Sequence, residues 1–147
     1  EELSHEECQA RWIREMKAVA PLAEEAGVIL CLENVGRGCG QSAEDLAALV
    51  EGVGSPNVLT YYDIGNACAF GHDAVEEIRT LAERIGVVHV KDREADLLGQ
   101  GIVDIPGCVD VLREVGYDGW LILETPATDD PLEAGNYNLA YLRDVVD

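Results

Sequence analysis

Four runs of mostly apolar residues recur along the chain, and a carboxylate residue stands at the end of each run. The runs cover 28–32, 58–62, 87–91 and 120–123, and they end at Glu33, Asp63, Asp92 and Glu124. Short runs of this kind, rich in β-branched residues, are typical of strands covered on both faces, as in a parallel sheet. Parallel α/β folds keep their chemistry at the carboxyl ends of the strands, so these polar ends are the candidate site.

Helix signals precede the first run and separate the others. Ser4 and Glu7 have the spacing of a capping box and predict a helix toward Gly27, in which Pro21 is expected to cause a kink or a break. Further helices are predicted over 42–53, 73–85, 106–115 and 131–146, and residues 64–72 are predicted to form a loop. Helical segments therefore alternate with strands along the chain.

The order of elements is one helix followed by four strand–helix pairs. This alternation predicts an α/β fold with a parallel sheet and right-handed crossovers. No linker or low-complexity segment divides the chain, so we predict a single domain over residues 1–147. Four such units are compatible with an open sheet, and they are also half of an eight-stranded barrel.

Composition and charge narrow the classes of partner. At 147 residues and 48% hydrophobic content, the chain is expected to form one globular domain. The formal net charge of −19 disfavours nucleic acid and anionic lipid, because both bind clustered Lys and Arg. No apolar run is long enough to span a membrane, and no signal peptide is recognisable. The five cysteines form no C-x-x-C pair, which favours reduced thiols and a cytoplasmic location over disulfides or a thiolate zinc site.

Three carboxylates and one imidazole are expected to meet at one edge of the predicted sheet. They are Glu33, Asp63, His89 and Glu124. Without a cation the carboxylates would repel one another, and this set of ligands suits Mn, Mg or Co, with Zn also possible. Each residue taken alone has a plainer interpretation, since a carboxylate after a strand often caps a helix and a histidine between valines often lies in a core. From the pattern alone, both interpretations remain open.

Several short motifs carry a resemblance to a known family. They are Leu32-Glu33-Asn34, Tyr62-Asp63-Ile64-Gly65-Asn66, His89-Val90-Lys91-Asp92, Gly99-Gln100-Gly101-Ile102-Val103-Asp104, Gly116-Tyr117-Asp118-Gly119-Trp120 and Leu123-Glu124-Thr125. In this order and spacing the chain resembles the C-terminal half of the sugar isomerase/epimerase superfamily, which has a xylose isomerase-like TIM barrel. Within it, the chain is most similar to sugar and sugar-phosphate 3-epimerases such as the L-ribulose/L-xylulose 5-phosphate 3-epimerases.

The resemblance implies a role for each residue at the strand ends. Glu33, Asp63, His89 and Glu124 match the four metal ligands of the superfamily. Glu33 and Glu124 also match the two glutamates that move a proton from one face of a sugar carbon to the other. Such chemistry needs a carboxylate on each face and a divalent metal to stabilise the charge of the enediolate.

Three further residues are expected to bind substrate. Arg93 matches an arginine that holds substrate oxygens. Asn66 stands where tagatose-type epimerases have a histidine, which favours the phosphopentose branch of the superfamily. Lys91 is expected either to contact a phosphate or to be a solvated charge at a strand end. His72 lies in a loop from which its side chain could reach the site, but we expect it to lie on the surface instead.

The sequence thus predicts a divalent-metal-dependent isomerase or epimerase that acts on a ketose or ketose phosphate. One alternative is a half-barrel that binds metal without catalysis. Another is a nuclease like endonuclease IV, which would need more histidines and a basic groove. Because four strands cannot close a barrel, we expect a homo-oligomer or pairing with a missing N-terminal half-barrel.

Overall fold

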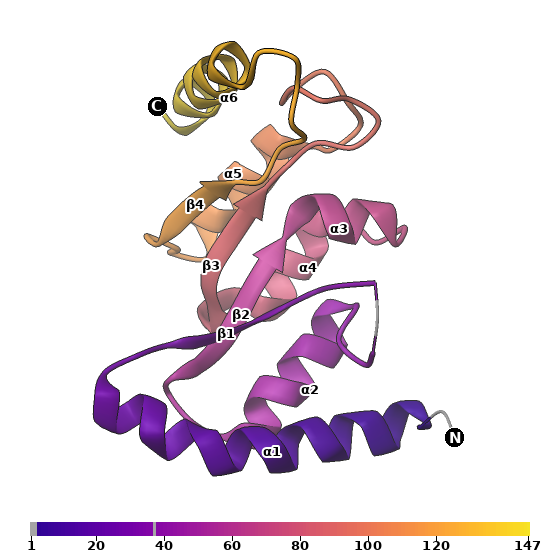
Figure 1. Cartoon of the computed structure of the whole chain (residues 1–147), viewed down its shortest axis with the longest axis vertical. Coiled ribbons are helices and arrows are strands. Elements are labelled where there is room, and N and C mark those ends of the chain that lie inside the picture. The colour runs from indigo at the N-terminus through magenta and orange to yellow at the C-terminus, as the bar shows by residue number, and fades with distance from the viewer. Residues whose placement is uncertain (1–2, 37) are drawn as a thin grey trace.

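A four-stranded parallel sheet forms the centre of the molecule. The computed structural model describes residues 3–36 and 38–147 and shows the strands in the order β1-β2-β3-β4 (Figure 1). Their bounds are Leu30–Glu33 for β1, Val58–Asp63 for β2, Ile85–Val90 for β3 and Trp120–Leu123 for β4. Because strands that are consecutive in sequence are also neighbours in space, every crossover advances the sheet by one position, as in a TIM barrel.

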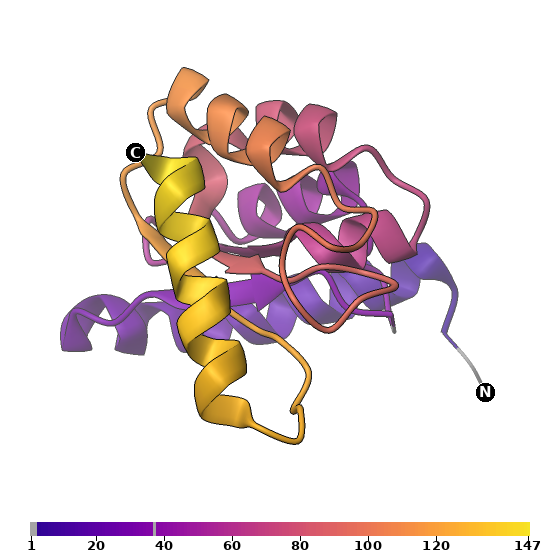
Figure 2. The same ribbon diagram turned by 90° about the horizontal axis from the view of Figure 1, so that it is seen from above.

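Helices follow the same order as the strands. They are α1 (His5–Ala26), α2 (Ala43–Val53), α3 (Ile64–Ala69), α4 (Ala74–Leu81), the short 3₁₀ helix η1 (Ala82–Arg84), α5 (Ile105–Glu114) and α6 (Pro131–Val146). Each long helix packs against the next, from α1 through α2, α4 and α5 to α6. Figure 2 shows α2, α4 and α5 together on one side of the sheet.

The predicted helix starts are confirmed by their capping bonds. The Ser4 N–H donates to Glu7 Oε2 at 2.9 Å, and the Glu7 N–H donates to Ser4 Oγ at 3.2 Å, which completes a capping box. Asp73 and Asp130 cap α4 and α6 with their carboxylates. Pro21 does not divide α1, which continues to Ala26.

Three predicted boundaries were wrong. The stretch 64–72 is not entirely a loop, because the Asp63 carboxylate accepts the Asn66 N–H at 2.7 Å and starts the short helix α3. Helix α4 ends at Leu81 rather than near 85, since Ala82 has a φ of 43° and Ile85 already pairs with Thr60 in the sheet. The first strand begins at Leu30 rather than at 28.

The core lies between the sheet and the helices. On that face Tyr62, Val88 and Val90 are buried and pack with Ile78 and Ile105 from the helices. The opposite face is largely open: Trp120 is 77% exposed and Ile122 is 41% exposed. The prediction that the strands are covered on both faces was therefore wrong for this chain, because the helices lie on one face.

Within the part of the chain that the structure describes, no helix combines the length and apolar character needed to span a bilayer.

Candidate metal centre

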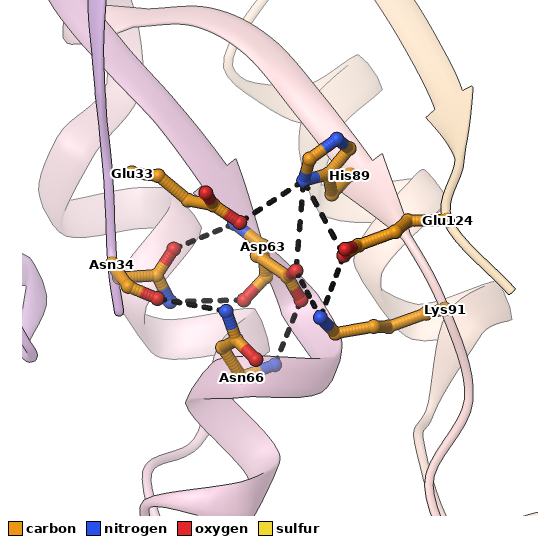
Figure 3. A network of polar contacts seen from close by, with 7 residues as sticks. All are labelled: Glu33, Asn34, Asp63, Asn66, His89, Lys91 and Glu124. Carbon is orange, nitrogen blue, oxygen red and sulfur yellow. Dashed lines mark hydrogen bonds and ion pairs between the residues drawn. The ribbon is translucent and has the colours of Figure 1, made fainter. Parts of the chain in front are cut away.

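The four predicted ligand residues converge at the carboxyl ends of the strands. Glu33 ends β1, Asp63 ends β2, His89 lies near the end of β3, and Glu124 follows β4 (Figure 3). Each offers one ligand atom, and these four atoms lie within 4.8 Å of one another. The predicted convergence is confirmed.

Strand register explains this convergence. Asp63 is the ladder partner of His89, and the Glu124 N–H donates to the Val90 carbonyl at 3.1 Å, which extends the pairing of β3 and β4 beyond the last assigned residue. Side chains alternate between the two faces of a strand, so residues at matching positions point to the same face. That face is the one that the helices leave open.

His89 lies in the middle of the cluster. Its Nδ1 is 3.1 Å from Glu33 Oε1 and 3.6 Å from both Asp63 Oδ2 and Glu124 Oε2. Its ring packs against Tyr61, with ring centroids 3.9 Å apart. One imidazole nitrogen thus faces three carboxylates, and packing against the aromatic ring holds its orientation.

Asn34 fixes the backbone of Asp63. The buried Asn34 side chain donates to the Asp63 carbonyl at 2.9 Å and accepts the Asp63 N–H at 2.7 Å. Asn66 then donates its side-chain N–H to the Asn34 carbonyl at 2.9 Å. In the sequence Asn34 stands out only as part of the Leu32-Glu33-Asn34 motif, and its one signal is that a polar residue directly follows a predicted strand.

Replacing Asn34 with Ala is expected to destabilise the protein by about 1–3 kcal/mol, because both backbone groups of Asp63 would lose a buried partner. Urea unfolding followed by circular dichroism measures this loss. Asn136→Ala, at an exposed position of α6, is the matched control and should leave the free energy of unfolding nearly unchanged. Equal stability of both variants would contradict the role given to Asn34.

Lys91 brings a cation into the cluster. Its Nζ lies 2.7 Å from Asp63 Oδ2 and 2.6 Å from Glu124 Oε2, and its side chain is only 16% exposed. The expectation of a solvated charge at a strand end was therefore wrong. Its contact with substrate stays a prediction.

The carboxylates of Asp63 and Glu124 have opposite pKa shifts. Burial raises the pKa of Asp63 above its ordinary value, although the ammonium of Lys91 and the N–H of Asn66 act against this shift. The hydrogen bond from Lys91 lowers the pKa of Glu124, which is more exposed. For Lys91 itself, burial lowers the pKa, but the two carboxylates outweigh that effect and raise it.

The residues of this cluster fit a divalent metal. Asp63 Oδ2 is buried and, among the described residues, forms an ion pair with Lys91 but no hydrogen bond of good geometry. A buried anionic oxygen of this kind is a strong ligand for a hard cation. Three carboxylates and an imidazole form the set of donors that Mn²⁺, Mg²⁺, Co²⁺ or Zn²⁺ accepts.

Arg93 and His72 lie outside the cluster. Arg93 is exposed in the loop after β3, where it borders a cavity of about 350 Å³ together with Asp96 and Pro126. His72 Nδ1 instead lies 2.8 Å from the buried carboxylate of Glu77, which also accepts the Tyr62 hydroxyl. His72 therefore belongs to a separate pair on the helix-covered side of the sheet, and its side chain is partly buried.

Residues 1–145 match the family model of the xylose isomerase-like TIM barrel. The chain belongs to this family. The four consecutive parallel strands and their helices fit part of a barrel of this kind, as the sequence predicted.

Relatives in the xylose isomerase-like family include sugar epimerases. The L-ribulose-5-phosphate 3-epimerase of Escherichia coli is 27% identical over 135 residues, a match that covers 87% of this chain and 48% of that enzyme. The inosose dehydratase of Geobacillus kaustophilus is 33% identical over 123 residues, covering 68% of this chain and 39% of that enzyme. The chain therefore spans less than half the length of these two relatives.

A solved structure of the same fold contains a metal. The structure of the IOLI protein with a bound zinc atom superposes with a TM-score of 0.85 at 21% identity, over 99% of this chain and 59% of that one. A likeness at this level of identity shows the fold alone.

Proposed function

We propose that this chain provides the metal site and the proton-transfer groups of a divalent-metal-dependent isomerase or epimerase that acts on a ketose or ketose phosphate. The observation that carries this proposal is the cluster of Glu33, Asp63, His89 and Glu124 at the strand ends. Family membership supports it, because the relatives named above include a sugar-phosphate epimerase.

The two glutamates stand on opposite flanks of the cluster, Glu33 at the end of the outer strand β1 and Glu124 directly after the outer strand β4. A sugar carbon between Glu33 and Glu124 would present one face to each carboxylate. One carboxylate removes the proton alpha to the carbonyl, and the other, in its protonated form, returns a proton to the opposite face. A bound divalent metal would stabilise the negative charge that develops on adjacent sugar oxygens.

Three other residues are proposed to bind the substrate. Arg93 is exposed in the loop after β3, and its guanidinium is proposed to hold sugar oxygens or a phosphate. Asn66 directs its side-chain nitrogen to the Asn34 carbonyl, so its amide oxygen is the group proposed to face the sugar. Lys91 is proposed to supply a positive charge at the same edge of the sheet.

The metal is proposed to be Mn²⁺, Mg²⁺ or Co²⁺, with Zn²⁺ as a further candidate. Carboxylate-rich sites favour the harder cations. Zn²⁺ is supported by the donor His89 and by the zinc atom bound to the IOLI protein, which has the same fold.

Metal binding is expected to stabilise the folded chain, because a ligand that binds only the folded state adds free energy of about 2.7 kcal/mol at a hundred times its Kd. For a domain of this size, that corresponds to a rise in Tm of roughly 5–10 °C. Differential scanning fluorimetry with each of the four cations, after chelation and dialysis, measures the shift.

Asp63→Asn is the informative variant for this test, since it removes the charge of a buried ligand. Its metal-dependent rise in Tm should disappear, whereas Asp144→Asn, at an exposed position of α6, should retain it. A wild-type Tm that does not respond to any of the four cations would refute the metal site.

A further inference from the structure

Lys91 uses the oxygens that a metal would need. Its Nζ contacts Asp63 Oδ2 and Glu124 Oε2, and these two oxygens are also the ones that lie 3.6 Å from His89 Nδ1 (Figure 3). The ammonium therefore contacts two of the oxygen atoms that are candidate metal ligands.

An ammonium and a divalent ion cannot both occupy this position. The metals proposed above bind oxygen at about 2.0–2.2 Å, which would bring the ion within van der Waals distance of an ammonium on the same two oxygens. Two cations at that separation repel strongly, and the effect is larger in a partly buried site than in water. The two cations therefore compete for these oxygens.

The stem of the Lys91 side chain lies close against Gly65. A Cβ built on Gly65 would lie 2.4 Å from Lys91 Cγ and 3.0 Å from the Lys91 carbonyl, so the glycine leaves room for the stem of the lysine. Rotation about the outer torsions of the side chain is enough to move the ammonium away from the two carboxylates. An ammonium displaced in this way remains within one side-chain length of the cluster.

We propose that Lys91 is an internal counter-ion that competes with the metal for Asp63 and Glu124, and that metal binding releases its ammonium toward an oxygen or phosphate of the bound sugar. This inference rests on the metal site of the proposed function. The position of the Lys91 ammonium then depends on whether the site contains metal.

Lys91→Met tests the competition, because Met keeps an unbranched side chain of similar volume and removes the charge. Isothermal titration with Mn²⁺ should show about ten-fold or more tighter binding to this variant than to the wild-type chain. Its Tm in the presence of a chelator should be lower, since the carboxylates of Asp63 and Glu124 lose their counter-ion. Lys17→Met is the matched control, because Lys17 is the only other lysine, lies exposed on α1 and gives the same change in net charge.

A second measurement follows the lysine itself. In a chain labelled with ¹³C-lysine, the two lysines give separate Cε signals, and titration with diamagnetic Mg²⁺ should shift the signal of Lys91 and leave that of Lys17 in place. Saturation of the shift should occur at the Mg²⁺ concentration that saturates the rise in Tm. A Lys91 signal that stays unchanged while the metal binds would refute the displacement.

The outcomes separate this inference from the proposed function. If the wild-type chain binds Mn²⁺ and Lys91→Met binds it equally or more weakly, the competition is refuted and the metal site stands. If only Lys91→Met binds Mn²⁺, the wild-type chain has no working metal site, and the proposed function and this inference both fail. If neither protein binds any of the four cations, the metal site fails and the inference fails with it.

Discussion

Replacing Glu124 with Gln is expected to lower the rate of epimerisation by about 10²–10⁴-fold in an assembly that turns over substrate, because a positioned carboxylate that transfers a proton contributes about that factor. Gln keeps the shape of Glu and can still offer one oxygen, so most of the loss falls on proton transfer rather than on folding. Exchange of the alpha proton of a ketose or ketose phosphate with D₂O, followed by NMR, measures this step directly.

Glu83→Gln is the matched control for this variant. Glu83 is exposed in η1, at the opposite end of the sheet from the cluster, and its substitution makes the same chemical change. Its rate of exchange should equal that of the wild-type protein. If the Glu124 variant also exchanges the proton at the wild-type rate, Glu124 does not transfer it and the assignment is lost.

We expect Asp63 to act mainly in metal binding and Glu124 mainly in proton transfer. Asp63 is buried, its Oδ1 accepts the Asn66 N–H, and its raised pKa arises from burial. Glu124 is more exposed and has a pKa lowered by Lys91, so it is held as the anion that a general base must be. Asp63→Asn should thus act on metal affinity, and Glu124→Gln on turnover.

The convergence of the cluster could be predicted because it depends on strand direction. Glu33, Asp63 and Glu124 each follow an apolar run, and the carboxyl ends of parallel strands meet at one edge whatever the details of packing. His89 was found for the same reason, since it lies near the end of the third run. The family resemblance then assigned their roles, which remain predictions.

Contacts that depend on side-chain geometry could not be predicted in this way. The reach of Lys91 to Asp63 is set by the outer torsions of a long side chain and by the missing Cβ of Gly65. The pair of hydrogen bonds between the Asn34 side chain and the Asp63 backbone depends on how two neighbouring strands end. Neither the side-chain torsions of Lys91 nor the geometry of the two strand ends can be read from the spacing of residues in the sequence.

The open face of the sheet was missed because the apolar runs alone do not say which element covers them. Trp120 and Ile122 project to the face that no helix of the described chain covers, and Ile29 is 55% exposed just before β1. Among the described strands, β1 and β4 each have a neighbour on one side only. Apolar sheet faces and free strand edges of this extent are association sites in soluble proteins.

The chain on its own is therefore expected to be poorly active, and to gain activity when its open face is covered by a second half-barrel. Relatives about twice as long as the match support this expectation, because their remaining residues are available to complete the barrel. Misplacement of a reacting group by about 1 Å costs about 10²-fold, so an incomplete pocket should lose at least that factor. An epimerase assay on the chain alone and after addition of an N-terminal half from a relative measures the gain.

Light scattering distinguishes a homodimer of this chain from a chain that pairs only with a separate N-terminal half-barrel. Two copies, each with a net charge of −19, repel at low ionic strength, so a homodimer should strengthen as salt is added. Trp120→Asp should abolish pairing by placing a charge on the open face, whereas Leu3→Asp, before α1, should leave it intact. A stable monomer with full epimerase activity would show instead that four strands suffice to build the site, and the exposed face would then need another explanation than a missing half.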